Sequence, residues 1–152
     1  MAATAWQLYN SAKKYIGNGT ITLGAGVFKM VLSNTASNAS TFTLTAYSQL
    51  TGEISATGGY VSGGKNLVPA TALWTVGASA KQFKFTMSTV GLAFTASGAS
   101  LTNIRYAVLR NSTGVGAGRL LCFCQLSSSQ FTVTSPNTLT VLPAATGIFT
   151  LT

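Results

Sequence analysis

The sequence predicts a mainly β protein, folded as an antiparallel, jelly-roll-like β-sandwich of about nine or ten short strands with one short N-terminal helix. Three observations lead to this prediction. Short apolar runs rich in β-branched and aromatic residues recur along the chain. Segments rich in Gly, Ser and Thr separate these runs and act as turns. Helical periodicity is convincing only near the start. The length of 152 residues fits a single domain, residues 1–152.

The predicted helix covers residues 5–16. Its apolar stripe includes Trp6, Tyr9 and Ile16. Lys13 and Lys14 lie near its C-terminal end, where positive charge complements the helix dipole. Gly17 is a suitable C-cap. An aromatic-rich terminal helix packs either on the sheet of its own domain or on a neighbouring subunit, and the sequence leaves both open.

Strand-like segments follow the helix and alternate with turn formers. They cover residues 20–23, 27–32, 53–56, 72–76, 81–87, 92–94, 104–110, 119–126, 131–133, 139–142 and 148–151, with the segment 53–56 as a short edge strand. Residues 45–50 are predicted to form one helical turn, and residues 33–41 a polar surface loop. In the segment 81–87 apolar and polar residues alternate strictly, which is typical of a half-buried antiparallel strand.

The segment 104–126 is predicted to be the central β-hairpin. In its second strand Cys122 and Cys124 point to one face, and Leu121 and Phe123 to the other. Apolar residues on both faces indicate that both sides of this strand are covered. A disulfide between two cysteines spaced in this way fits extended backbone poorly, and the sequence has no histidine to complete a metal site. We therefore interpret both cysteines as small packing residues.

The glycine pairs around residues 58–64 have the spacing of a phosphate-binding loop, and Lys65 follows them. The residue after the lysine is Asn66, however, where that loop needs Ser or Thr before a helix. Glycine at these positions more simply supplies the backbone freedom that tight turns require. The segment is therefore predicted to form turns.

Charge is scarce and unbalanced. Nine Lys and Arg residues face a single acid, Glu53, so the formal net charge is +8, and only 7% of residues are charged. In an ordinary globular protein about a quarter of the residues are charged. This composition therefore favours a protein that is part of an assembly, in which neighbouring subunits cover part of its surface. A basic surface attracts nucleic acid, anionic lipid or an acidic protein, although a diffuse positive field that aids solubility explains it equally well.

Neither a signal peptide nor an apolar run of membrane-spanning length is apparent in the sequence. We therefore expect the protein to be made and kept in a cytosol, or packaged from one. No membrane partner is expected.

An enzyme is not favoured, and no cofactor, metal or small-molecule substrate is expected. General acid–base catalysis usually relies on histidine, and glycoside hydrolysis needs two carboxylates. The chain has no histidine and one acid. A Ser–Lys pair with Lys65 or Lys81 is conceivable, but nothing marks a partner. Arg105, Tyr106 and Arg110 mix cations and an aromatic ring, as single-strand binders do. Tyr106 shares its predicted face with core-like residues, so direct nucleic-acid binding is also not favoured.

Several stretches of the chain resemble a family of small tailed-bacteriophage virion proteins, in the same order over nearly the whole length. These stretches are residues 5–23, 28–32, 59–65, 104–109 and 145–151. The resemblance implies a β-sandwich protein of the virion, most like a capsid decoration (cement) protein. Such a protein would be made in the host cytoplasm and then bind the major capsid protein on the capsid exterior as a homotrimer.

A second interpretation remains open within the same family: a tail, baseplate or fibre module that binds other tail proteins or host glycans. For either role, the candidate partner contacts lie on the helix and on two basic loops. They are Trp6, Tyr9, Lys13, Lys14, Lys65 and Arg119.

Overall fold

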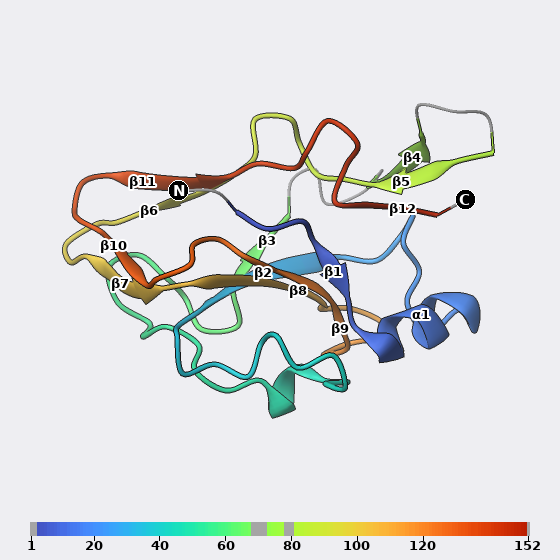
Figure 1. Cartoon of the computed structure of the whole chain (residues 1–152), viewed down its shortest axis with the longest axis horizontal. Helices are drawn as coiled ribbons and strands as arrows, with labels where there is room; N and C mark the ends of the chain where they lie inside the picture. The colour runs from blue at the N-terminus through green and yellow to red at the C-terminus, as the bar shows by residue number, and fades with distance from the viewer. Residues whose placement is uncertain (1–2, 68–72, 78–80, 152) are drawn as a thin grey trace.

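The computed structural model describes residues 3–67, 73–77 and 81–151. Within these ranges the protein is mainly β, with twelve strands in antiparallel sheets and one short α-helix (Figure 1). The prediction of a mainly β, antiparallel protein with one helix near the N-terminus is therefore confirmed. None of the helices in the described ranges has the length and apolar character needed to cross a membrane.

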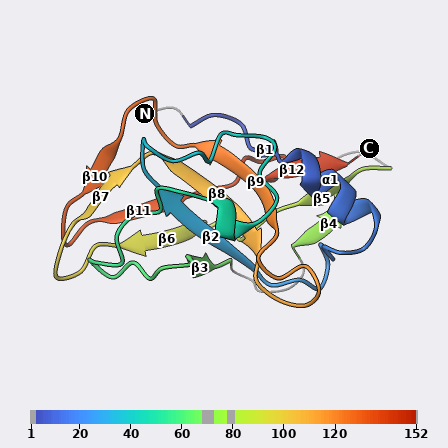
Figure 2. The ribbon, with the colours of Figure 1, turned by 90° about the horizontal axis from the view of Figure 1, so that it is seen from below.

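The largest sheet has five strands in the order β1–β9–β8–β2–β3. Its strands are β1 (Gln7–Leu8), β9 (Leu120–Gln125), β8 (Tyr106–Asn111), β2 (Phe28–Ser33) and β3 (Lys65–Asn66). Seen from below, β1 and β3 lie at opposite edges (Figure 2).

Three smaller sheets and two helical segments complete the fold. The sheets pair β10 (Phe131–Val133) with β7 (Leu101–Ile104), β11 (Thr138–Val141) with β6 (Leu92–Thr95), and β12 (Phe149–Leu151) with β5 (Phe83–Phe85) and β4 (Trp74–Val76). The α-helix is α1 (Asn10–Gly17), and a 3-10 turn covers Tyr47–Gln49.

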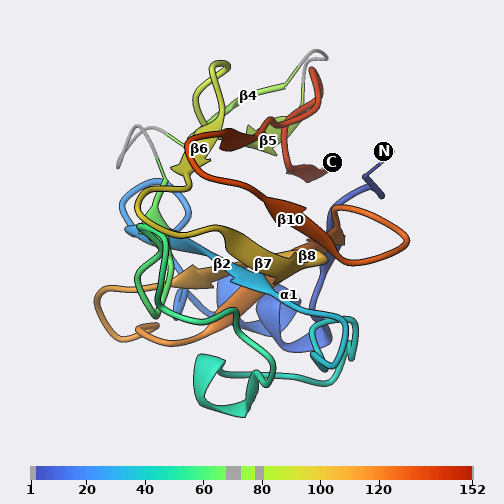
Figure 3. The ribbon, with the colours of Figure 1, turned by 90° about the vertical axis from the view of Figure 1, so that its left-hand side faces the viewer.

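Both faces of the five-stranded sheet are covered. Strands β5, β6, β11 and β12 lie over one face, which we call the upper face, and α1 with the segment 34–62 lies over the other, the lower face (Figures 1 and 3). The ring of Phe28 on β2 packs 4.9 Å from Phe85 above, and the ring of Phe123 on β9 packs 5.1 Å from Tyr9 below. Each fully buried apolar side chain of this kind contributes about 1.5–3 kcal/mol.

The predicted central hairpin is confirmed in β8 and β9, which pair antiparallel and are almost entirely buried. Ile104 differs from the prediction, because it belongs to β7 and pairs with β10. The two cysteines are buried free thiols, as expected of packing residues. Burial raises the pKa of the Cys124 thiol to about 12 and also raises that of Cys122, so both thiols are neutral at ordinary pH.

The predicted start of the helix at residue 5 is wrong. Residues 7 and 8 form strand β1 and pair with Phe123 and Cys122, because an extended chain here satisfies the free edge of β9. The helix begins only at Asn10. It includes Gly17, which was expected to cap it, and Asn18 takes the C-cap position.

Two further strand predictions need correction. Residues 20–23 form turns, because Ile21 donates its N–H to Tyr15 O at 2.8 Å and so joins the helix rather than a sheet; Ile21 is nevertheless buried. In the segment 53–56 a single bridge between Glu53 and Ser33 replaces the expected edge strand. The helical turn expected at 45–50 is confirmed by the 3-10 turn. Residue 72, the start of the predicted strand 72–76, lies outside the described residues.

Candidate partner-binding surface

The six candidate contact residues do not converge on one patch. Trp6 is half-buried beside β1, and Lys65 is exposed on β3, at the opposite edge of the five-stranded sheet. Lys13 and Lys14 are exposed on α1. Arg119 is half-buried just before β9. The structure therefore separates Trp6 from Lys65.

Tyr9 has to be removed from the set of contacts, because its side chain is fully buried. Its ring packs on Phe123, and its hydroxyl donates to Ala39 O at 2.7 Å. Burial raises the pKa of the hydroxyl far above its usual value. The residue fastens the loop around residue 39 to the sheet and cannot contact a partner in this fold.

Arg119 lies next to the helix that carries the two exposed lysines. Its guanidinium lies over the ring of Tyr15, 4.9 Å from the ring centroid, which is a favourable cation–π geometry. Tyr15 directly follows Lys14 on α1. The structure therefore brings Arg119 and α1 together, as neighbouring sources of positive charge.

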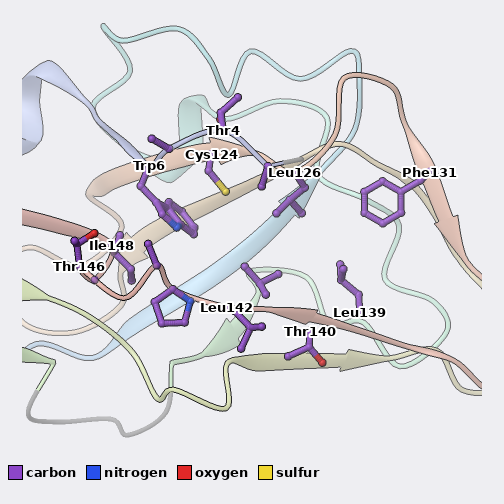
Figure 4. Close-up of a pocket in the computed structure, with 16 residues that line it drawn as sticks. Thr4, Trp6, Cys124, Leu126, Phe131, Leu139, Thr140, Leu142, Thr146 and Ile148 are labelled. Carbon is purple, nitrogen blue, oxygen red and sulfur yellow. The ribbon is translucent and has the colours of Figure 1, made fainter. Parts of the chain in front are cut away.

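Trp6 points into a cavity of about 590 Å³ between the N-terminal segment, β9 and the chain around β11 (Figure 4). The lining includes Cys124, Leu126, Phe131 and Ile148. None of the lining residues is a Lys, Arg, Asp or Glu, and the Cys124 thiol is neutral at ordinary pH. The cavity therefore provides apolar packing space rather than reactive groups.

The most highly connected polar group is one that the sequence did not single out as a site: the carboxylate of Glu53. Oε1 accepts hydrogen bonds from Tyr60 Oη at 2.6 Å and from Gly63 N at 2.7 Å. Oε2 accepts from Tyr47 Oη and, more weakly, from Ser62 Oγ at 3.3 Å. The signal available in the sequence was that the only acid stands ten residues before a glycine pair.

The two tyrosines connect this carboxylate to the sheet. Tyr60 Oη also accepts the N–H of Leu32 on β2 at 3.1 Å. Burial, followed by the hydrogen bond to Glu53, raises the pKa of both Tyr47 and Tyr60, so the hydroxyls remain donors. The turn prediction for residues 58–64 is confirmed here, since Gly63 and Gly64 both have positive φ angles of 86° and 82°.

All four groups that donate to Glu53 are uncharged. Arg110, a cation that contacts two members of this network, donates instead to Gly63 O and lies over the Tyr47 ring, 4.4 Å from its centroid. Because Glu53 is the only Asp or Glu in the chain, the nine basic side chains have no other side-chain carboxylate to pair with.

Other cations use uncharged partners in the same way. Lys65 Nζ donates to Ala93 O at 2.8 Å, and Arg105 lies over the ring of Tyr106, 5.3 Å from its centroid. Nε of Arg105 is buried and has no hydrogen-bond partner within the described ranges. Tyr106 itself is buried, so it offers no ring for stacking with a base.

Comparison of the chain with protein-family models, with curated proteins and with solved structures finds no match.

Proposed function

We propose that the protein is a non-enzymatic virion structural protein that binds the outside of a phage capsid shell, contacts the major capsid protein and stabilises the lattice. The observation that supports this most is electrostatic. The chain carries a formal charge of +8, and its one side-chain carboxylate is engaged by uncharged donors within its own loop. Any carboxylate that compensates the cations must come almost entirely from another molecule, and an acidic shell surface provides many.

The composition of the surface also supports a role in an assembly. Exposed positions are filled largely by Ser, Thr, Gly and Ala, with few charges. An extended positive field raises the rate of encounter with an acidic partner and weakens as salt is added. In this proposal the layers around the five-stranded sheet form a jelly-roll-like sandwich, and three copies assemble as a homotrimer on the shell.

Binding would stabilise the shell through linkage. A ligand that binds the assembled lattice but not the dissociated subunits stabilises the lattice at every occupied site, by about 2.7 kcal/mol when its free concentration is a hundred times Kd. Many such contacts across subunit seams would resist rupture. The chemistry requires no catalytic residue.

The test adds purified protein to expanded capsid shells that lack it, and measures co-sedimentation and the melting temperature of the shell. We expect saturable binding and a higher melting temperature. Absence of both would refute the proposal. Immunogold labelling of virions gives the second result: gold spread over the head supports a decoration protein, whereas gold at the tail would favour the tail, baseplate or fibre alternative.

A further inference from the structure

A row of hydrogen-bond donors crosses three adjacent strands of the five-stranded sheet. Lys29 on β2 is directly opposite Asn66 on β3 and directly opposite Arg110 on β8. Residues directly opposite each other in an antiparallel pair project from the same face. The neighbours of Lys29 in the chain, Phe28 and Met30, are fully buried, and Phe28 packs against Phe85 on the upper face. The donor row Asn66–Lys29–Arg110 therefore projects from the lower face.

Two of the three members are cations placed side by side. Directly opposite residues have Cβ atoms about 4.5–5.5 Å apart, and like charges at this spacing destabilise a sheet. Lys29 and Arg110 are both half-buried, so water screens their repulsion only in part. Lys65 Nζ donates to Ala93 O, whereas the Lys29 ammonium donates no hydrogen bond to any of the described residues. The fold therefore maintains a repulsive pair in which, among the described residues, neither cation forms an ion pair with a carboxylate.

Arg110 is also held in a fixed position. Its Nε and Nη2 donate to Gly63 O at 3.1 and 2.9 Å, while its guanidinium lies on the Tyr47 ring. Both of these supports are bound to Glu53. The sole acid of the chain thus positions a guanidinium without forming an ion pair with it. Preorganised donors lose little side-chain freedom when a ligand binds.

The remaining nitrogen of the guanidinium is free to take a ligand. Nη1 of Arg110 has no hydrogen-bond partner among the described residues, and it is not one of the buried unpaired atoms. It is therefore accessible to solvent. Lys29 is directly opposite Arg110 on the next strand, and the exposed Asn66 is opposite Lys29 one strand further on, where its amide adds uncharged donor capacity.

We propose that the donor row Asn66–Lys29–Arg110 binds a carboxylate of an Asp or Glu side chain on the partner protein. One carboxylate oxygen accepts from Arg110 and the other from Lys29, which offsets the repulsion between the two cations. The partner is taken to be the acidic shell protein of the proposed function, and the inference rests on that function for this point alone.

A protein carboxylate fits this site better than a nucleic-acid backbone. A strand of phosphates needs a continuous basic track with exposed aromatic rings. The other exposed cations lie on other parts of the fold. Lys13 and Lys14 are on α1, Lys81 lies just before β5, and Lys65 projects from the opposite face of the sheet, since it is paired with Met30. The row offers two adjacent cations, which is the scale of a single carboxylate.

The first experiment titrates the full chain with an acetylated, amidated Gly-Glu-Glu-Gly peptide at low salt, followed by NMR shifts of the backbone amides. We expect saturable shifts centred on Lys29, Asn66 and Arg110. Lys29→Gln should weaken binding about five- to tenfold, the range expected for loss of one charge contact. Lys84→Gln, on the three-stranded sheet β12–β5–β4, removes the same charge away from the row and should change binding less than about twofold. Equal weakening by both variants would overturn the site.

A thermal melt of each variant checks that weaker binding is not caused by unfolding. Lys29→Gln should melt at or slightly above the wild-type temperature, because the substitution removes the repulsion between Lys29 and Arg110. A clear fall in melting temperature would show that Lys29 has an internal partner and would contradict the argument. The same titration with a single-stranded oligonucleotide must bind the row more weakly than the peptide. If the oligonucleotide binds through Lys29 more tightly than the peptide does, with a steep dependence on salt, the preferred ligand of the row is a phosphate and the proposal is overturned.

Shell binding separates this inference from the proposed function. If the peptide binds the row but the wild-type protein does not bind shells, the site stands and the capsid function fails. If shells bind wild-type protein and Lys29→Gln equally well, the function stands and the assignment of its contact is wrong. Loss of shell binding in Lys29→Gln, with Lys84→Gln unaffected, supports both.

Discussion

Removing the Glu53 carboxylate should destabilise the fold far more than a half-buried loop residue normally would. Three of its hydrogen bonds are short, from Tyr47, Tyr60 and Gly63. A hydrogen bond to a charged group contributes about 1.5–3 kcal/mol, and the lower end applies here because Glu53 is partly exposed. The three bonds share one carboxylate, so their contributions are not additive. Glu53→Ala, which also leaves the largely buried Tyr60 hydroxyl without its acceptor, should lower the free energy of unfolding by about 3–4 kcal/mol.

Glu53→Gln tests the charge separately from the shape. The amide oxygen can still accept from Tyr60 and Gly63, so the loss should fall to about 1–2 kcal/mol, the difference between charged and neutral hydrogen bonds. For a chain of this size each 1 kcal/mol corresponds to about 2–4 °C in Tm. Glu53→Ala should then melt about 6–16 °C below the wild type, and Glu53→Gln about 2–8 °C below it.

The assay is urea denaturation followed by circular dichroism, with Ser62→Ala as the matched control. The Ser62 hydroxyl is exposed and contacts Glu53 at 3.3 Å, so its removal should cost less than about 0.5 kcal/mol. A loss below about 1 kcal/mol for Glu53→Ala, or a loss as large for Ser62→Ala, would show that the carboxylate does not hold this loop.

Three further predictions follow from burial and backbone geometry. Phe85→Ala, at a fully buried side chain, should lower the free energy of unfolding in denaturant by about 3–5 kcal/mol. Phe83→Ser, at a side chain that is 46% exposed, should lower it by less than about 1.5 kcal/mol. Similar losses for the two variants would contradict the assigned faces of β5. Gly64→Ala should prevent folding or lower the free energy of unfolding by more than about 3 kcal/mol, because the added Cβ would lie 2.2 Å from the Met30 backbone oxygen. Gly114→Ala should lower it by only about 1–2 kcal/mol, the cost of a positive φ angle, because the space around Gly114 is open. Stability should fall as the pH rises above 9, because the unfolded Cys124 thiol ionises near 9.0 and the folded one only near about 12. A series of melts between pH 8 and pH 11 that stays flat would be inconsistent with the buried thiol.

The parts of the fold that could be predicted from the sequence are those fixed by neighbouring residues. Strands β8 and β9 follow from apolar residues on both faces of a short run, and the turns near residue 60 follow from paired glycines. The start of the helix could not be predicted in this way. Residues 7 and 8 are equally acceptable in a helix, and only the distant edge of β9 makes them a strand.

In the candidate site, too, features that depend on neighbouring residues could be predicted, and features that depend on distant contacts could not. The sequence revealed that Glu53 is the only acid, but not that Tyr47, Tyr60 and Gly63 surround it, because those contacts depend on how the loop folds back. The donor row depends on strand register, which aligns Lys29 with Arg110 across 81 positions of sequence. Tyr9 is among the candidate contacts because the sequence leaves open whether the aromatic-rich N-terminal helix packs on its own sheet or on a neighbouring subunit. Its burial against Phe123 requires the strand-then-helix path that the sequence did not indicate.

The pairing of β1 with β9 has a consequence for the synthesis of the protein. Residues 7 and 8 pair with residues 123 and 122, so this segment cannot take its place in the sheet until β9 has been synthesised. Contacts of such long sequence separation slow folding, because a large loop must close before they form. A chain that stops before β9 lacks the partner of β1 and one of the two partners of β8, and so leaves an edge of β8 unpaired. Only chains that extend through β9 can therefore complete the central sheet, which excludes shorter products from any assembly that selects for a finished fold.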